Sequence, residues 1–345
     1  MKMIFLRLVK LVICLVLVTA ISSTAFGEEF YKGKIIQFIV AYSPGGGYDT
    51  YTRAIARHIG KYIPGNPTAI VQNRTGAGGL IAAHYIYDRA QPDGLTVGIW
   101  NSSFVLHQGL GSRRVKFDAR RFGWIGAPVT GEPSCSVMGF TGLKTLDDIL
   151  NSKTPIKMGV SGVGTGLELP QLLNMAFDRP VFKVIRGYKG TAPVRLAMQS
   201  REVDGLCMAF ESARVVARSM LDAKGDDKMI PFLIHGDAQD PEVRDIPRIK
   251  DVVKGKGNQA MLNAWLQTYN FQRPMSLPPG TPKERLNILR RAFKATLEDP
   301  VFLADAKKSK LSIQYVSGEQ IEKYIDQMLS ISATTKERLK WIVPK

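Results

Sequence analysis

Three glycine-rich turns hold the residues of this sequence that are best suited to bind an anion. Residues 43–49 read Ser-Pro-Gly-Gly-Gly-Tyr-Asp, residues 73–79 read Asn-Arg-Thr-Gly-Ala-Gly-Gly, and residues 161–166 read Ser-Gly-Val-Gly-Thr-Gly. Backbone N–H groups at a helix start point toward anions, and the helix dipole adds to the attraction. Glycine can also do no more than permit a tight turn. Three turns of one kind favour a shared cleft over that alternative.

Each turn lies between an apolar run and a helical pattern. After the first turn, apolar residues recur every four positions from Tyr51 to Ile63, while three cations fall on another face. A similar pattern follows the second turn at residues 80–87. Alternation of short apolar runs with helical patterns predicts layered α/β units. The expected strands are residues 35–41, 69–72, 96–100, 137–140, 157–160, 181–184, 205–209 and 231–235.

The order and spacing of these turns resemble the Bug (TctC) family, the periplasmic solute-binding receptors of tripartite tricarboxylate transporters. The resemblance rests on the pairing of residues 44–49 with residues 73–79 and covers nearly the whole chain after residue 27. Further matches are Pro92-Asp93-Gly94, Gly162-Val163-Gly164-Thr165, Tyr188-Lys189-Gly190 and Val203-Asp204-Gly205.

The resemblance implies a two-lobe α/β fold of the type II-like periplasmic binding protein class. Mixed sheets flanked by helices would form the lobes, with a ligand cleft between them. We assign residues 28–126 and 262–345 to lobe 1, and residues 127–261 to lobe 2. Glycine and proline at 123–133 indicate the first crossing between lobes, and the polar stretch 236–258 followed by 265–271 indicates the return. The strands between residues 137 and 235 are expected to form one second sheet.

One helix is predicted from its start signals alone. Thr281 suits an N-cap, Pro282 suits the first helical position, and Glu284 follows three residues after the cap. We expect this helix to run through Leu297.

In the family the ligand is a small carboxylate held largely by backbone N–H groups and ordered waters. Several backbone donors can converge on a carboxylate without the entropic cost of ordering long side chains. Carrying this role over by matching motifs gives the candidate ligand-binding residues Ser43, Gly46, Gly47, Tyr48, Asp49, Gly76, Ala77, Gly78, Ser161, Gly164, Thr165, Tyr188 and Thr191.

Two of these residues have structural alternatives. Asp49 complements the dipole of a first helical turn whatever the ligand. Thr165 could form a capping box with Glu168, in which neither side chain touches the ligand. Both readings stay open from the sequence.

Two departures from the family pattern bear on the ligand. Tyr42-Ser43 and Tyr48 stand where many members have Phe-Ala and a smaller residue, and Glu168 stands where histidine is common. The extra aromatic surface could stack on a planar or longer ligand. Negative charge from Glu168 would disfavour a citrate-like ligand, so we expect a mono- or dicarboxylate, including aromatic acids.

The first 27 residues have a basic start, an apolar core from Leu11 to Ala20, and small residues at Ala25 and Gly27. This pattern predicts a secretory signal peptide cleaved before Glu28 and hence a periplasmic protein. Its apolar core is shorter than the roughly 20 residues that span a bilayer. Without it the chain keeps 44 Lys and Arg against 30 Asp and Glu. These cations form no long run, so we expect a scattered, solvated surface and no nucleic-acid partner.

The sequence does not match the motifs compared with it for catalysis or dinucleotide binding. The dinucleotide pattern G-x-G-x-x-G fails in each turn, at Thr50, Ile81 and Leu167, and Val163 breaks a nucleophile elbow. No cofactor and no metal site is expected. Cys135 and Cys207 would permit a disulfide in an oxidising compartment, with two buried thiols as the alternative.

The sequence therefore predicts a monomeric, non-enzymatic receptor that delivers a small organic carboxylate to the large and small permease subunits of a tripartite transporter. One alternative is a ligand sensor that presents its closed form to a membrane signalling protein. Another is an enzyme on a similar two-lobe scaffold.

Overall fold

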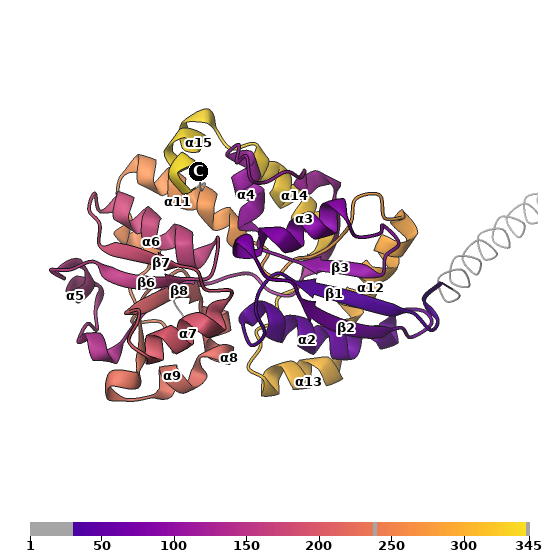
Figure 1. The fold of residues 1–345 in the computed structure, drawn as a ribbon, viewed down its shortest axis with the longest axis horizontal. Coiled ribbons are helices and arrows are strands. Elements are labelled where there is room, and N and C mark those ends of the chain that lie inside the picture. The colour runs from indigo at the N-terminus through magenta and orange to yellow at the C-terminus, as the bar shows by residue number, and fades with distance from the viewer. Residues whose placement is uncertain (1–29, 237–239, 343–345) are drawn as a thin grey trace, which may run out of the picture.

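The computed structural model describes residues 30–236 and 240–342 and has two α/β lobes lying side by side (Figure 1). The predicted signal peptide, residues 1–27, lies outside the described residues. Of the helices in the described ranges, none combines the length and apolar character needed to traverse a bilayer. The N-terminal part of the chain and a late segment together build the lobe that carries β1 (Figure 1).

The first sheet has six strands in the order β11-β4-β10-β3-β1-β2. Parallel pairs join β1 to β2 and β3, whereas β10 and β11 pair antiparallel with their neighbours. The strands are β1 (Ile35–Val40), β2 (Thr68–Asn73), β3 (Thr96–Ile99), β4 (Gly123–Ala127), β10 (Met275–Leu277) and β11 (Val316–Ser317). The helices of this lobe are α2 (Gly47–Ile59), α3 (Leu80–Asp88), α4 (Ser103–Gly109), α12 (Lys283–Glu298), α13 (Pro300–Lys308) and α14 (Gly318–Leu329).

The second sheet has five strands in the order β7-β6-β8-β5-β9, as predicted for residues 137–235. Its strands are β5 (Pro133–Met138), β6 (Ile156–Val160), β7 (Phe182–Arg186), β8 (Gly205–Ala209) and β9 (Met229–Ile234). The helices around it are α5 (Leu146–Leu150), α6 (Thr165–Ala176), α7 (Thr191–Gln199), α8 (Phe210–Val216), α9 (Arg218–Asp222), α10 (Ile249–Val252), α11 (Lys256–Leu266) and α15 (Ala333–Leu339). Both sheets are mixed and flanked by helices, which confirms the predicted fold class.

The helix after the first turn follows its predicted period. Tyr51, Ile55 and Ile59 are buried against the first sheet, and Ile63 is buried just beyond the helix end. The predicted cap of α12 is wrong by one residue. Pro282 is the N-cap, and the Thr281 hydroxyl instead donates to the carbonyl of Pro278. The helix itself ends at Glu298, one residue past the predicted end.

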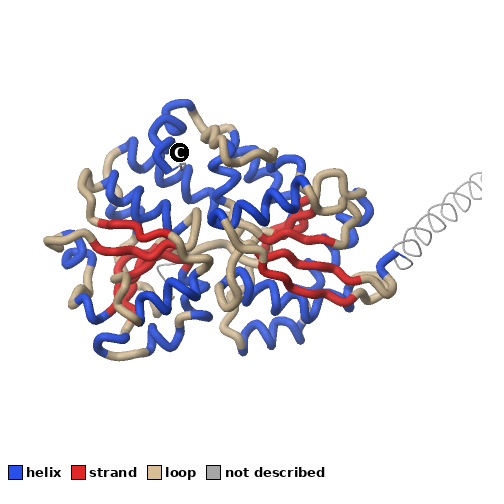
Figure 2. The backbone as a smooth tube through the Cα atoms, in the orientation of Figure 1, coloured by secondary structure: helices blue, strands red, loops and turns tan. Residues whose placement is uncertain are grey.

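The crossings between the lobes lie side by side in loop segments between the two sheets (Figure 2). Part of the expected first crossing is in fact strand β4, because residues 123–127 pair with β10 and β11. Val129 pairs antiparallel with Gln272, and the N–H of Gly131 donates to the carbonyl of Tyr269. Two connections therefore brace one another at the hinge. The C-terminal helix α15 packs on α11, beside the second sheet.

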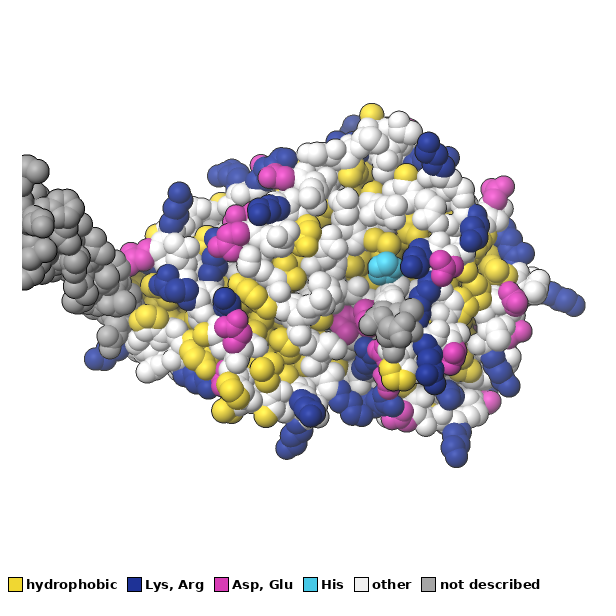
Figure 3. All heavy atoms as spheres, turned by 180° about the vertical axis from the view of Figure 1, so that it is seen from behind, with side chains coloured by type: hydrophobic (Ala, Val, Ile, Leu, Met, Phe, Trp, Pro, Cys, Tyr) yellow, Lys and Arg dark blue, Asp and Glu magenta, His cyan; other side chains and the backbone are white. Residues whose placement is uncertain are grey.

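Surface charge is dispersed on the face turned away from the view of Figure 1. There, Lys and Arg side chains lie among acidic and uncharged ones (Figure 3). Ion pairs hold several cations of the described residues, such as Arg290 with Glu319 and Glu322. The arrangement agrees with the scattered, solvated surface expected from the sequence.

Candidate functional site

An inner cavity of about 70 Å³ lies between the lobes, where three helices begin. Gly46 and Gly47 line it at the start of α2, Thr165 and Gly166 at the start of α6, and Thr191 at the start of α7. Tyr48 and Ser161 line it as well. Six of the predicted site residues therefore share this cavity: Gly46, Gly47, Tyr48, Ser161, Thr165 and Thr191.

The three helix starts leave backbone donors free. Their N-caps are Gly46, Gly164 and Gly190, and among the described residues no side chain caps these helices. The first N–H groups of a helix lack partners within it. No Asp or Glu occurs among the described residues that line the cavity. The positive ends of three helix dipoles thus lie at the cavity wall.

An outer cavity of about 370 Å³ adjoins the inner one and shares Tyr42, Ser161 and Val163 with it. The predicted residues Gly76, Ala77, Gly78 and Tyr188 line this second space. Three cationic residues also line it, namely Arg114 from one lobe and Arg186 and Lys189 from the other. Of the described residues lining this space none is acidic, so the approach to the helix starts carries positive charge.

Glycines let the two lobes touch across the cleft. A Cβ on Gly162 would lie 2.7 Å from the carbonyl oxygen of Gly78 and 2.8 Å from its Cα. On the other side of the cleft, the N–H of Ser43 donates to the carbonyl of Lys189, and the Arg195 Nη2 donates to the carbonyl of Gly45. Any side chain at Gly162 would force the backbones of the lobes apart.

Asp49 and Ser43, two of the predicted contacts, do not line either cavity. The Asp49 carboxylate accepts bonds from the Gly45 N–H, from Arg53 and from Asn73, and these partners lower its pKa against the opposing effect of burial. Asn73 also donates to the carbonyl of Tyr42. Asp49 therefore joins the first turn to the second. The Ser43 hydroxyl is buried and has no partner among the described residues.

The capping alternative for Thr165 is wrong, because Gly164 is the N-cap and Thr165 is the first helical residue. The Thr165 hydroxyl instead forms a 2.7 Å hydrogen bond with the Tyr269 hydroxyl. Gly164 itself faces neither cavity; a Cβ there would lie 2.7 Å from the Asn101 amide nitrogen. Thr165 is thus tied to the segment that crosses between the lobes.

Glu168, whose negative charge we expected to disfavour a citrate-like ligand, forms hydrogen bonds to three side chains and lines neither cavity. Glu168 is fully buried and accepts bonds from His107 Nε2 at 2.8 Å, Trp265 Nε1 at 2.7 Å and Ser103 Oγ at 3.1 Å. Burial alone would raise its pKa, but the hydrogen bonds from His107, the Gly164 backbone and Trp265 together outweigh burial and lower it. Glu168 joins α6 to α4 of the other lobe. Its charge still acts at the inner cavity, where burial and, to a smaller extent, Glu168 raise the pKa of Tyr42 and Tyr48.

Sequence reasoning missed four polar residues that line the inner cavity: Asn101, Ser212, Gln272 and Arg273. Arg273 is 2% exposed and bonds Glu211 through Nη2 at 2.9 Å. Burial acts to lower its pKa, but Glu211 raises it, so the guanidinium remains charged. The sequence carried little signal for Arg273, because residues 270–276 mix polar and apolar types.

Two tyrosines, Tyr42 and Tyr48, line the inner cavity. Burial raises the pKa of the Tyr42 and Tyr48 hydroxyls, so both stay protonated. Tyr42 donates to the carbonyl of Gly78, whereas the Tyr48 hydroxyl has no partner among the described residues. Their rings lie 4.7 Å apart. The aromatic surface expected from the sequence is therefore present at the first turn.

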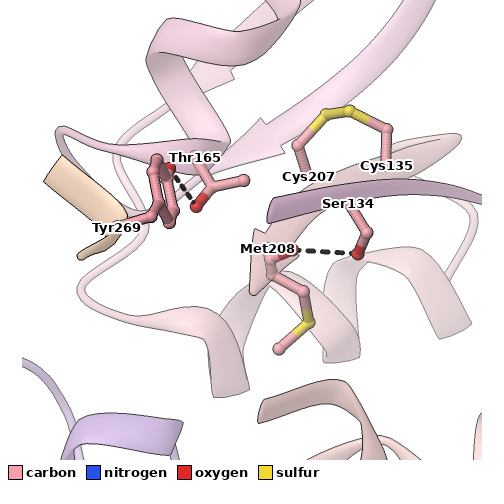
Figure 4. The surroundings of a disulfide bond; sticks show 6 residues. All are labelled: Ser134, Cys135, Thr165, Cys207, Met208 and Tyr269. Carbon is pink, nitrogen blue, oxygen red and sulfur yellow. Dashed lines mark hydrogen bonds between the residues drawn. A yellow bond between two sulfur atoms is a disulfide. The ribbon is translucent and has the colours of Figure 1, made fainter. Parts of the chain in front are cut away.

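Cys135 and Cys207 form a disulfide between β5 and β8, which settles the alternative left open by the sequence. Figure 4 shows the bond, together with the nearby hydrogen bond between Thr165 and Tyr269. Cys207 lines the inner cavity. The disulfide fixes the strand pair that carries one wall of this cavity.

Comparison with known proteins agrees with this architecture. Residues 52–339 match the model of the tripartite tricarboxylate transporter family receptor. Protein BugT of Bordetella pertussis is 36% identical over 99 residues, a match that spans 29% of this chain and 29% of BugT.

Solved structures share the fold at low identity. The periplasmic binding protein BugD superposes with a TM-score of 0.71 at 21% identity, covering 90% of this chain and 98% of BugD. MatC from Rhodopseudomonas palustris, solved with bound malate, gives 0.69 at 18% identity over 90% of this chain and 99% of MatC. An R. palustris protein solved with adipate gives 0.69 at 18% identity, over 90% and 97% of the two chains.

The family model covers most of the chain, and the two-lobe fold of these structures matches the one described above. This chain therefore belongs to the TctC family of tripartite tricarboxylate transporter receptors, a family of periplasmic solute-binding proteins.

Proposed function

We propose that this protein is a periplasmic receptor that holds a small organic carboxylate between its lobes and delivers it to a two-subunit permease of the tripartite type. It acts as a monomer and catalyses no reaction. The ligand-binding residues are those of the inner and outer cavities, with Asp49, Ser43 and Gly164 supporting the loops. The family supports the receptor role, and the cleft supports the ligand class.

The observation that carries this proposal is the meeting of three uncapped helix starts in a cavity lined by no acidic residue in the described part of the chain. Free N–H groups and aligned dipoles stabilise negative charge. A neutral ligand would balance the partial positive charge of these N–H groups less well than a carboxylate would.

The volumes of the two cavities indicate which part of the ligand each would hold. The inner space of about 70 Å³ suits one carboxylate group with a few neighbouring atoms, and the outer space of about 370 Å³ suits the rest of a small acid. The malate and adipate complexes of the two R. palustris neighbours support a dicarboxylate as the ligand. Cations at the mouth, such as Arg114, would face its second carboxylate.

A thermal-unfolding screen tests the proposal. The purified protein, unfolded and refolded to remove carried-over ligand, is heated with succinate, malate, adipate, citrate or benzoate, and with their amides. At about 100 times its Kd a ligand adds about 2.7 kcal/mol to the native state. We expect at least one acid to raise the Tm by several degrees while its amide does not.

Two results would count against the proposal. A panel in which no acid raises the Tm would reject a carboxylate receptor. Conversion of a stabilising acid to a product during incubation, followed by chromatography, would replace the receptor with an enzyme. Recovery of the unchanged acid is the expected outcome.

A further inference from the structure

A buried arginine in the hinge segment reaches the inner cavity. Arg273 directly precedes Pro274 and strand β10, and its neighbour Gln272 pairs with Val129 of the other crossing. Its backbone φ of 55° is in the left-handed region, which non-glycine residues seldom adopt. The surrounding structure therefore holds this side chain at a defined place on the cavity wall.

The guanidinium is held on one side and free on another. Nη2 donates to Glu211 at 2.9 Å and also bonds the hydroxyl of Ser212. The ring of Tyr51 lies 4.3 Å from the guanidinium carbon and supports its plane. Nε and Nη1 are buried and have no hydrogen-bond partner among the described residues.

Buried polar groups in folded proteins are nearly always paired. Three unpaired donors therefore stand out at one wall of this small cavity: Arg273 Nε, Arg273 Nη1 and the hydroxyl of Tyr48. The Arg273 guanidinium lies 5.8 Å from the Tyr48 ring centre. An acceptor that also carries negative charge satisfies such donors better than a neutral one.

From this geometry we infer that Arg273 is the charged anchor for a ligand carboxylate in the inner cavity, with Tyr48 as a second donor and Glu211 as the residue that positions the guanidinium. The inference rests on the proposed function and adds a requirement to it. The group bound in the inner cavity must be ionised, so the protein discriminates an acid from its amide or ester through Arg273.

Glu211 is suited to hold the Arg273 guanidinium in place. It is 1% exposed, and its second oxygen accepts the N–H of Glu132 at 3.0 Å. Both of its oxygens are thus occupied, one on Arg273 and one on the backbone at the start of β5. Because removing one partner of a buried ion pair leaves a charge without compensation, the main variant neutralises both residues together.

The test is the ratio of the Kd of an amide to that of its acid, measured by calorimetry. The probes are succinate, adipate and benzoate with succinamate, adipamate and benzamide. The wild type is expected to prefer at least one acid by about tenfold or more, as for a charge-assisted hydrogen bond. In the double variant Arg273→Gln/Glu211→Gln, the ratio of the amide Kd to the acid Kd should be about tenfold lower than in the wild type.

Arg290→Gln serves as the control, since Arg290 lies on α12 and forms bonds with Trp124, Glu319 and Glu322. It should keep the wild-type ratio. A folded double variant that also keeps the ratio would overturn the role of Arg273 and leave the carboxylate receptor intact. A wild type that binds none of the acids would reject the receptor and this inference together.

Glu211→Gln alone gives a second, independent test, in which the bound acid compensates the charge left on Arg273. It leaves Arg273 charged without the counter-ion seen in the structure, so a ligand carboxylate would take the place of Glu211. The acid preference should then rise severalfold above wild type. An unchanged or lower preference in Glu211→Gln contradicts the assignment.

Discussion

Replacing Glu168 with alanine is expected to lower the free energy of unfolding by about 3–5 kcal/mol, because each buried donor left without an acceptor costs about 1–3 kcal/mol. Glu168 accepts three hydrogen bonds, from His107, Trp265 and Ser103, and all four side chains are buried. Alanine leaves three buried donors without an acceptor. Unfolding in urea, followed by circular dichroism, measures the loss.

The matched control is Glu319→Ala. Glu319 pairs with Arg290 at the surface, and exposed ion pairs contribute about 0–1 kcal/mol. If Glu168→Ala loses no more stability than this control, the buried cluster does not join the lobes as described.

The same cluster gives a pH dependence with a definite sign. Because the folded-state pKa of Glu168 is below its ordinary value of 4.5, its contribution is complete above that value and is lost as the pH falls through the folded pKa. The wild type should therefore lose more stability than Glu168→Gln on acidification below about pH 4.5.

Introducing a single methyl group at Gly162 is expected to weaken ligand binding by about 100-fold, near the upper end of the 1–3 kcal/mol found for overpacking. The added Cβ would meet backbone atoms of Gly78 at 2.7 and 2.8 Å, and backbone cannot move aside as a flexible side chain can. The lobes must separate, which opens the cleft. Titration of Gly162→Ala with an acid that stabilises the wild type measures the effect.

Gly142→Ala controls for backbone strain alone. Gly142 also has a positive φ, of 72°, but a Cβ there meets nothing within 4 Å. It should lose some stability and keep the wild-type affinity. Wild-type affinity in Gly162→Ala would show that contact between Gly78 and Gly162 is not needed for binding.

Much of the fold could be predicted because local patterns determine it. The period from Tyr51 to Ile63 and the glycine turns gave β1, α2, β2 and α3 close to their observed bounds. Strands β10 and β11 were missed, since they have three and two residues and exist only through pairing with β3 and β4. Such short strands carry no period of their own.

The site was harder to predict from the sequence than the fold was, because the positions of its side chains depend on partners far away in the chain. Arg273 lies buried only because Glu211, 62 positions earlier, neutralises it. The hydrogen bonds of Glu168 could not be predicted for the same reason, because His107 comes from the other lobe. The disulfide was undecided until the register placed Cys135 opposite Cys207. Backbone donors in the turns, by contrast, follow from glycine and helix signals alone.

Hydrogen–deuterium exchange tests most directly whether a carboxylate is held by the three helix starts. The wild type is compared with and without a saturating amount of the acid that gives the largest rise in Tm. We predict slower exchange in peptides covering residues 43–50, 161–168 and 188–193, because their N–H groups would bond the ligand and line the closed cleft. Stabilisation by the acid with unchanged exchange in all three segments would contradict this account.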